Sequence, residues 1–257
     1  MKTVLGFCGK LGSGKGYHML KTVEDLKSNG YSIFMVSFAD PIKQILRDSF
    51  GLQKTGKMNT KLPDLSELYV KYQVVDKLYE LVKNLDCEKF KGVSEKDLKS
   101  DILYNYENYE KEFYTHIKKA VDGKWHPEYD RKDFSDYPYH FRRLGQMLGT
   151  ELGRNLIDTI WVDTAFNKIK NVFRNNLADF ATIDDVRFVN EFKALEEFRT
   201  KTIFSSKIYG IVTTDDVRAE RRGMLLEELK KQDEHSSEKE IDEIINLIPK
   251  ENIIINN

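Results

Sequence analysis

One glycine-rich segment near the amino terminus constrains the fold more than any other part of the sequence. Residues 6–18 have the sequence GFCGKLGSGKGYH, with five glycines and two lysines around one serine. An apolar run of strand-favouring side chains precedes the segment at residues 3–8, and a helical period begins at Tyr17. The glycines are therefore predicted to lie on a turn between a strand and a helix.

The spacing within this turn matches a phosphate-binding loop. Residues 9–15 satisfy the first seven positions of G-x-x-x-x-G-K-[ST], in which successive backbone N–H groups surround a phosphate. Glycine is needed because side chains would block that approach, and the following helix directs its positive N-terminus at the same anion. The alternative is a glycine-rich turn with a solvated lysine, which the strand and helix context disfavours. Lys15 is predicted to be a catalytic cation that reaches the β and γ phosphates, and the residues predicted to bind the nucleotide are Gly9, Lys10, Gly12, Ser13, Gly14, Lys15, Gly16 and Tyr17.

Gly16 stands where a Ser or Thr hydroxyl would normally ligate Mg²⁺. The form GSGKG resembles the loops of adenylate-kinase-like nucleoside monophosphate kinases, in which the metal is held largely through water. This resemblance implies that no side chain ligates Mg²⁺ directly. Asp184 is predicted to lie at the end of a strand, where its carboxylate can hold the hydrated ion through water. Tyr17 replaces the threonine that usually follows in adenylate kinases, so close kinship with adenylate kinase itself is not expected.

Length, charge and cysteine content limit the class of protein. A chain of 257 residues is long enough for one α/β domain with an insertion. The 41 basic and 42 acidic residues give a formal net charge of −1, which favours small-molecule partners over nucleic acid. Cys8 and Cys87 form no disulfide framework, and no apolar stretch approaches the ~18 residues of a membrane span. The expected location is the cytoplasm, or the host cytoplasm if the protein is viral, with no membrane partner.

Apolar runs alternate with helical patterns along much of the chain. The alternation predicts a mostly parallel sheet between layers of helices, with ligands at the carboxyl ends of the strands. A helix is predicted over residues 42–50, with Asp40 as its N-cap, Pro41 at its first position and Gly51 at its end. The predicted strands lie within residues 3–8, 31–38, 180–186, 203–213 and 253–255.

The stretch from residue 54 to residue 139 has little strand signal and is predicted to be an inserted, mostly helical subdomain. Helical patterns cover residues 65–85 and 102–113, and residues 124–139 are predicted to be an irregular connector. An aromatic series recurs at helical spacing, which favours a core face over a platform for nucleotide bases. Its members are Tyr106, Tyr109, Phe113 and Ile117.

Four segments after the glycine-rich loop resemble one family. They are FADPIK at residues 38–43, RRLGQMLGTELGR at 142–154, DVRFVNE at 185–191 and DEHSSE at 233–238. Their order and spacing, with the loop, resemble the bacteriophage-type deoxynucleoside monophosphate kinases over nearly the whole chain. The resemblance implies a single domain over residues 1–257, a P-loop kinase three-layer sandwich with a five-stranded sheet. It also implies that the insertion at 54–139 binds the acceptor and that residues 215–240 form a lid.

Arginines are the predicted ligands of the acceptor's phosphate. A monophosphate dianion is bound best by permanently charged, forked donors, and the candidates are Arg143, Arg154 and Arg187. Arg142 cannot share a helix face with Arg143 and is expected to be a surface or ion-pair residue.

Polar side chains complete the predicted acceptor site. Gln146 offers a donor and an acceptor that could read a base edge, and its alternative is an exposed helical glutamine. The resemblance favours Asp185 as a ligand of the acceptor nucleotide, whereas its alternative is an N-cap for the following helix. Asp40 and Lys43 from FADPIK are the remaining predicted substrate-binding residues.

Arg218 and Arg221 follow a predicted strand and lie on neighbouring faces of a helix. Related kinases carry lid arginines in this place, so both are predicted to be catalytic cations that close over the phosphates. The alternative is a basic helix face paired with nearby glutamates. His235, Ser237 and Glu238 match the family's His-x-Ser-Glu pattern, but an anionic acceptor requires no general base.

The function expected from the sequence is transfer of the γ-phosphoryl group of ATP, with Mg²⁺, to a (deoxy)nucleoside monophosphate for nucleotide supply. One alternative is another small-molecule kinase of the same fold, of the dephospho-coenzyme A or phosphomevalonate type. A second is a nucleotide-binding protein without catalytic activity. The sequence leaves open which base is accepted and whether the chain forms a homodimer.

Overall fold

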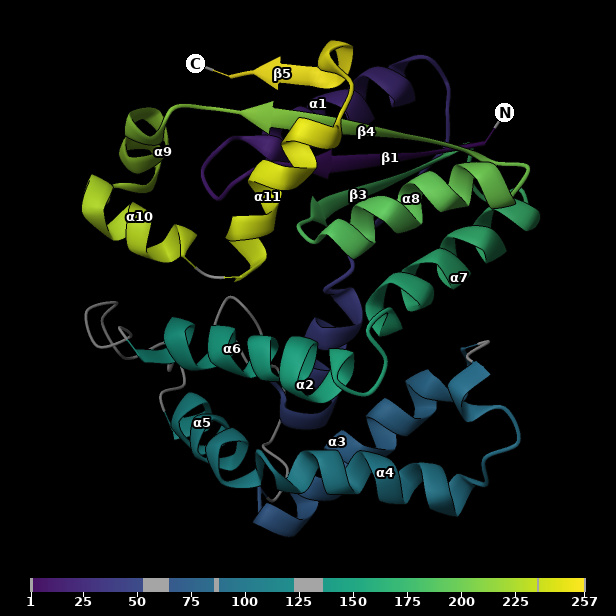
Figure 1. Ribbon diagram of the computed structural model, residues 1–257, viewed down its shortest axis with the longest axis vertical. Coiled ribbons are helices and arrows are strands. Elements are labelled where there is room, and N and C mark those ends of the chain that lie inside the picture. Colours follow the sequence, from purple (N-terminus) through teal and green to yellow (C-terminus); the bar gives the residue numbers. More distant parts are fainter. Residues whose placement is uncertain (1, 53–64, 86–87, 123–135, 235, 257) are drawn as a thin grey trace. The chain divides into compact units, whose positions relative to one another are not determined.

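A computed structural model describes residues 2–52, 65–85, 88–122, 136–234 and 236–256. The chain forms two compact units, one of Met1–Phe38 with Ala165–Asn257 and the other of Ala39–Thr164 (Figure 1). Cys87, His235 and most of the connector predicted at 124–139 lie outside the described residues. None of the described helices is both long enough and apolar enough to cross a membrane.

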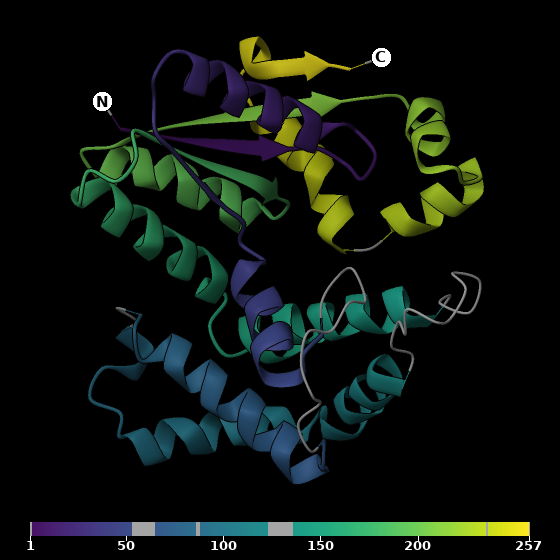
Figure 2. The same ribbon diagram turned by 180° about the vertical axis from the view of Figure 1, so that it is seen from behind.

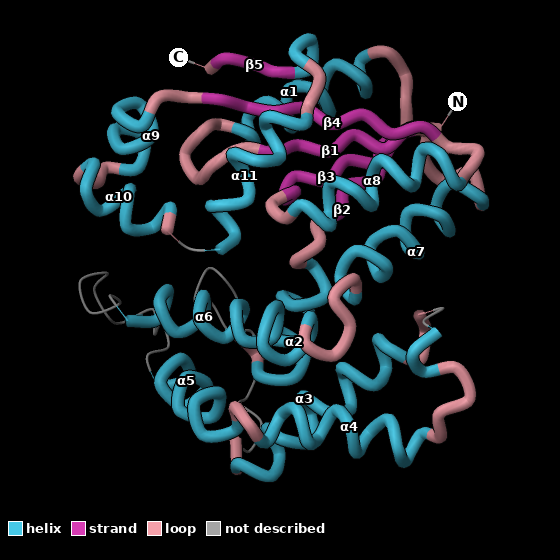
Figure 3. The backbone as a smooth tube through the Cα atoms, in the orientation of Figure 1, coloured by secondary structure: helices cyan, strands magenta, loops and turns pink. Residues whose placement is uncertain are grey.

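The first unit is built on a five-stranded sheet, drawn in magenta in Figure 3. Every strand pair in this sheet is parallel. The strand order is β2-β3-β1-β4-β5, and Thr3 at the start of β1 lies opposite Phe180 on one side and Ser205 on the other. The five predicted strands are confirmed, the second and fourth being shorter than expected. Their bounds are β1 Thr3–Cys8, β2 Ile33–Val36, β3 Phe180–Val186, β4 Ser205–Val212 and β5 Ile253–Ile255.

Helices cover both faces of this sheet. The helix α1 (Lys15–Ser28) lies on one face, and α8 (Val189–Lys201) and α11 (Ser236–Leu247) lie on the other (Figures 1 and 2). Alternation along β1 explains the layers, because Leu5 and Phe7 pack with Met19 of α1. A Cβ on the intervening Gly6 would lie 2.9 Å from Leu195 of α8, so glycine allows that helix its close approach. The predicted three-layer α/β sandwich is confirmed.

The connections between strands run in opposite directions across the sheet. From β1 the chain crosses over β3 to β2 at one edge of the sheet, whereas from β3 it crosses over β1 to β4, towards the other edge. Such a reversal leaves the carboxyl ends of neighbouring strands open to a ligand. Beyond β4 the chain forms α9 (Asp215–Arg222), α10 (Leu226–Asp233) and then α11 and η4 (Lys250–Asn252). Gly223 ends α9 in the left-handed region, with φ 61°.

The second unit contains only helices among its described residues. The prediction that Asp40 caps the first of them is wrong, because Ala39 occupies the N-cap position and Asp40 is already helical. The predicted end at Gly51 is confirmed by its left-handed φ of 65°. The elements are α2 (Asp40–Phe50), α3 (Glu67–Val82), η1 (Glu88–Phe90), α4 (Glu95–Glu107), α5 (Glu110–Asp122), α6 (Asp136–Gln146), the π-helix η3 (Met147–Arg154) and the start of α7 (Ile160–Arg174).

The helical pattern predicted over residues 102–113 is divided between two helices. The chain turns at Asn108 and Tyr109, so α4 and α5 fold against each other and the rings of Tyr106 and Phe113 meet edge to face, with centroids 5.9 Å apart. Tyr106, Phe113 and Ile117 are fully buried, which confirms the predicted core face, while Tyr109 is partly exposed. Local spacing predicted the buried face but not the turn within it.

Candidate active site

The glycine-rich loop joins β1 to α1 as predicted, and its backbone requires glycine at several positions. Gly12 and Gly14 have φ of 86° and 88°, in the left-handed region that other residues rarely adopt. A Cβ on Gly9 would lie 2.6 Å from the Ser13 hydroxyl and 2.7 Å from the carbonyl of Ile211. These three glycines are therefore needed for the loop to take this shape.

The structure does not require glycine at position 16. A Cβ added there would meet nothing within 4 Å, and its φ is not in the left-handed region. The protein itself would accommodate a side chain at the position where Ser or Thr is usual. The neighbouring Tyr17 is 65% exposed, so its ring is not part of the core.

The Ser13 carbonyl fixes the loop to the end of β4 and to the last described residues. It accepts hydrogen bonds from Thr213 Oγ1 at 2.9 Å and from Asn256 Nδ2 at 2.7 Å. The Ser13 hydroxyl is buried and has no hydrogen-bond partner within the described part of the chain. Most buried hydroxyl groups in proteins have a hydrogen-bond partner. The Ser13 hydroxyl is therefore an exception, and it can donate a hydrogen bond to a ligand bound in the loop.

Lys15 begins α1 in an unfavourable setting for a cation. Burial, and next the charge of Arg187, lower the pKa of its ammonium group to about 8, although Glu238, Asp184 and Cys8 act in the opposite direction. The same burial raises the pKa of the Cys8 thiol to about 12, so this cysteine is neutral at physiological pH. Burial and the charge of Arg187 therefore outweigh the attraction of the Glu238 and Asp184 carboxylates for the Lys15 ammonium group.

Asp185 has a structural partner at the end of β2. Its carboxylate accepts from the Phe38 N–H at 2.8 Å and from the Ser37 hydroxyl at 2.5 Å. The N-cap interpretation of Asp185 is wrong, because Phe188 occupies the N-cap position of α8. The buried carboxylate of Glu191 instead accepts from the Arg187 and Phe188 N–H groups at the start of that helix.

Arg187 follows β3, and its guanidinium contacts a buried carboxylate. Its Nη1 donates to Glu238 Oε1 at 2.6 Å, and the Glu238 side chain is 1% exposed. Glu238 was identified in the sequence only as part of a motif, without a role. Its contact crosses 51 residues of sequence, so no local pattern could have revealed it.

Of the two predicted lid arginines, Arg218 is buried and Arg221 is exposed. The Arg218 guanidinium donates to the carbonyl of Leu11 and to the carboxylates of Asp215 and Asp233, at 2.7–2.9 Å. Arg221 Nη1 lies 3.5 Å from the Ser13 carbonyl, beside the loop. Catalytic roles for both remain predictions, and Arg218 is the one whose donors already have protein partners.

Lys10 is also held by carboxylates. Its ammonium group lies 2.7 Å from Asp242 and 3.9 Å from Asp233. A role for Lys10 in nucleotide binding remains a prediction.

The other predicted acceptor residues lie in the second unit. Arg143 on α6 donates from Nε to Glu112 at 2.9 Å and from Nη1 to Glu151 at 2.7 Å. These two glutamates were not identified from sequence, because they are 31 and 8 residues away and belong to other elements. Arg142 is exposed, as expected.

The remaining predicted residues of this unit lie on three elements. Arg154 ends η3 and donates weakly to the Asp158 carbonyl at 3.4 Å. Lys43 and Asp40 form an exposed ion pair at 3.3 Å on α2, and Gln146 ends α6 and is partly exposed. Arg187 and Asp185 belong to the first unit and these residues to the second, so the structure divides the predicted acceptor set between the units.

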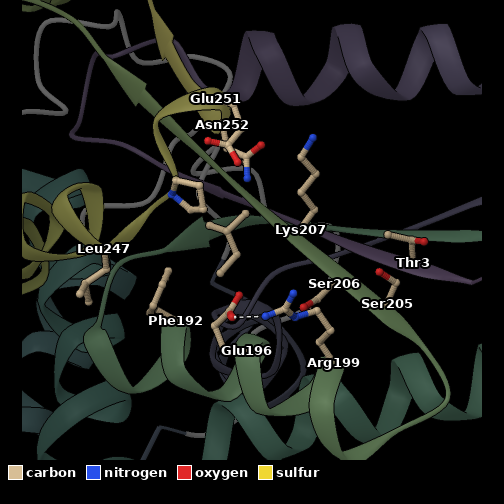
Figure 4. A pocket seen from close by; sticks show the side chains of 12 residues that line it. Thr3, Phe192, Glu196, Arg199, Ser205, Ser206, Lys207, Leu247, Glu251 and Asn252 are labelled. Carbon is tan, nitrogen blue, oxygen red and sulfur yellow. Dashed lines mark hydrogen bonds and ion pairs between the residues drawn. The ribbon is translucent and has the colours of Figure 1, made fainter.

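A cavity of about 570 Å³ lies near the first residues of β1 and β4, and Figure 4 shows the side chains that line it. Thr3 and Ser205, the first residues of β1 and β4, line it together with residues of α8 and η4. The glycine-rich loop follows the carboxyl end of β1, so this cavity is separate from the candidate active site. Among the described residues, no three His, Cys, Asp or Glu side chains cluster as ligands of a metal ion.

The all-parallel sheet with a glycine-rich loop between its central strand and the first helix defines an α/β protein of the P-loop kinase fold. A model of the deoxynucleotide monophosphate kinase family matches residues 5–239, and the chain belongs to that family. The resemblance seen in the sequence is confirmed. No individual curated protein matches the chain.

Proposed function

We propose that this kinase transfers the γ-phosphoryl group of ATP to a deoxynucleoside monophosphate, forming the diphosphate. Family membership supports the kinase activity and the deoxynucleotide substrate. The observation that carries the choice of a nucleoside triphosphate as donor is the loop. Its Ser13 hydroxyl has no hydrogen-bond partner among the described residues, and burial beside Arg187 lowers the pKa of its Lys15 ammonium group. A polyphosphate supplies acceptor oxygens for the Ser13 hydroxyl and negative charge beside the Lys15 ammonium group.

The proposed donor site is the segment from Gly9 to Tyr17. Backbone N–H groups and Lys15 bind the β and γ phosphates, and the open space at Gly16 leaves room for the nucleotide or its hydrated metal. Mg²⁺ keeps several of its waters when it binds beside phosphates. The Asp184 carboxylate is close enough to Lys15 to raise the pKa of its ammonium group, so it would lie near the phosphates and could hold the ion through water. When bound, the ion would neutralise charge on the phosphates.

The proposed acceptor ligands are Arg187 and Asp185 of the first unit and Asp40, Lys43, Arg143, Gln146 and Arg154 of the second. The carboxylates of Glu112 and Glu151 fix the orientation of the Arg143 guanidinium, which retains further N–H donors for a phosphate. We assign acceptor binding to residues 54–139 and a lid over the phosphates to residues 215–240.

The chemical step needs positioning and charge neutralisation more than covalent help from the protein. An anionic oxygen of the acceptor's phosphate forms a bond to the γ-phosphorus while the bond to the β,γ-bridging oxygen breaks, and ADP leaves. Lys15 and Arg221 stabilise the charge on the transferred group. No general base is required, since the nucleophile is already deprotonated. The reaction would supply deoxynucleotides for DNA synthesis in the cytoplasm of a bacteriophage-infected cell.

A substrate panel tests this proposal. ATP and Mg²⁺ are incubated with each of the common ribo- and deoxyribonucleoside monophosphates, and the products are separated by chromatography. We expect acceptor-dependent ADP formation with at least one deoxynucleotide. ATP binding without turnover would support the non-catalytic alternative, and turnover only with dephospho-coenzyme A or phosphomevalonate would support a different small-molecule kinase.

A further inference from the structure

Both backbone groups of one loop residue are held by side chains from the segment after β4. The N–H of Leu11 donates to Glu238 Oε2 at 3.0 Å, and its carbonyl accepts from Arg218 Nε at 2.9 Å. Both side chains are 1% exposed. Leu11 lies between Gly9 and Gly12, so these contacts act on the middle of the loop, not on its ends.

The backbone of α9 also packs against the next residue of the loop. A Cβ on Gly12 would lie 3.2 Å from the Arg218 carbonyl. Four of the N–H donors of Arg218 are used by Leu11, Asp215 and Asp233, and Asp233 also attracts Lys10. A guanidinium with four N–H donors already bonded to the protein holds its acceptors in place and has little capacity left to bind a ligand.

Glu238 links the loop to a second part of the candidate site. Its Oε2 holds Leu11, while its Oε1 accepts from Arg187 Nη1 at 2.6 Å. A buried carboxylate is stable only when such charged and N–H partners surround it. The shape of the loop and the orientation of Arg187 therefore depend on the same side chain.

We propose that Arg218 and Glu238 are positioning residues that hold the peptide of Leu11 and so set the shape of the phosphate-binding loop, and that Glu238 also orients Arg187. The inference rests on the proposed function for the meaning of the loop and of Arg187. It gives α9 and α11 a role in ligand binding that requires no contact with the ligand, and it makes the binding of the two substrates depend on one carboxylate.

Two substitutions at Glu238 separate its two contacts. Glu238→Gln keeps an oxygen for the Leu11 N–H but removes the charge that pairs with Arg187, whereas Glu238→Ala removes both. We expect Glu238→Gln to raise the KM of the acceptor by about tenfold with less than about threefold change in the Kd of ATP, since a charge-assisted hydrogen bond is lost. Glu238→Ala should raise both constants by about tenfold. Glu243→Gln and Glu243→Ala, at an exposed position of α11, are the matched controls.

Arg218→Lys tests the other contact, because it keeps the charge but loses the fork that spans Leu11 and Asp233. We expect the Kd of ATP to rise by about tenfold, while Arg222→Lys at an exposed position of α9 leaves it unchanged. Hydrogen exchange of residues 9–14 is measured in all variants without ligand. Exchange in this segment should be faster in Glu238→Ala and Arg218→Lys than in either control.

The two proposals fail in different ways. If the wild-type chain phosphorylates no acceptor, the proposed function fails, but loop exchange still reports on Leu11. If hydrogen exchange of residues 9–14 in the folded variants is as slow as in the controls, or if the variants bind ATP and acceptor as the controls do, the positioning roles are wrong.

The pH dependence of proton uptake on ATP binding is a further readout. The midpoint of this dependence should lie at lower pH in Glu238→Gln than in the wild type, because the charge of Glu238 raises the pKa of Lys15. An unchanged midpoint would also count against the role of Glu238.

Discussion

Lys15 loses its proton more readily than an ordinary lysine because it is buried beside Arg187, and bound phosphates would reverse that effect. The pKa of the free protein's Lys15 is about 8, and a polyphosphate anion should raise it towards the normal value of 10.5. ATP binding should therefore take up a proton above neutral pH, about half a proton at pH 8 and almost none at pH 6. Calorimetry in buffers of different ionisation enthalpy measures this uptake. Lys15→Arg should abolish it, because guanidinium stays protonated.

Removal of the Lys15 side chain tests its catalytic role separately. Lys15→Ala should fold, since the residue lies at a loop–helix junction and its burial as a cation is unfavourable. Its turnover should fall by about a hundredfold or more, because the charge that supports the transferred phosphoryl group is lost. Circular dichroism and steady-state kinetics make the comparison. Near-normal turnover would show that the loop does not bind the reacting phosphates.

Arg143 should affect the acceptor and not ATP. Arg143→Ala is expected to raise the acceptor's KM by about tenfold or more, as a lost charge-assisted contact is worth roughly 1.5–3 kcal/mol. The substitution also leaves Glu112 and Glu151 without their shared partner, so the melting temperature must be measured beside the kinetics. Arg142→Ala, exposed on the same helix, is the control. Equal increases in the KM of both substrates would place Arg143 outside the acceptor site.

At the scale of elements, two glycines in the consecutive helices α6 and η3 differ in what surrounds them. A Cβ on Gly153 in η3 would lie 2.2 Å from the Trp161 ring and 2.7 Å from the Leu148 carbonyl, whereas one on Gly145 in α6 would meet nothing within 4 Å. Trp161 is fixed in place by its hydrogen bond to the Gly149 carbonyl at 2.7 Å. Gly153→Ala should lower the free energy of unfolding by about 1–3 kcal/mol through overpacking.

Gly145→Ala is the matched control for that substitution. It should be neutral or should stabilise by up to about 1 kcal/mol, because alanine favours a helix. Urea denaturation measures both variants. Equal free energies of unfolding in the two variants would mean that the side chains around Trp161 accommodate the added methyl group without loss of stability, and the prediction would be wrong.

The strands and most helices were predictable because hydrophobic period and glycine positions are local signals. The loop, its flanking elements and the order of strands and helices follow from such signals. The turn at Asn108, the π-helical turn of η3 and the N-cap at Ala39 do not, since tertiary packing decides them. The same holds within the site. The type of residue at Lys15 and Arg187 indicates phosphate chemistry, but the pairing of Glu238 with Leu11 and Arg187 spans up to 227 residues and is visible only in the structure.

At the scale of the whole molecule, we expect the proposed lid, residues 215–240, to close as substrates bind. The segment is rich in charge, and more than half of those of its residues whose burial the structure describes are exposed, but Arg218, Ala219, Leu229 and Glu238 are buried. Such a segment is held at a few points and exposed between them, which favours local opening over rigidity throughout. Arg221 lies on its exposed part beside the loop, so it is the arginine best placed to meet phosphates on closure.

Arg221→Ala should therefore lower kcat more than it weakens ATP binding, since a contact made mainly in the closed complex appears in turnover. The expected loss in kcat is about tenfold or more, whereas Arg222→Ala, exposed on the same helix, should have little effect. Hydrogen exchange tests the motion itself. A bisubstrate analogue that joins adenosine to a deoxynucleoside through phosphates should slow exchange over residues 215–240 more than ATP alone does. If exchange over residues 215–240 is already slow without ligand and does not change with the analogue, the segment is a rigid part of the fold. The lid proposal would then be wrong, and any contact of Arg221 with the phosphates would be made without closure.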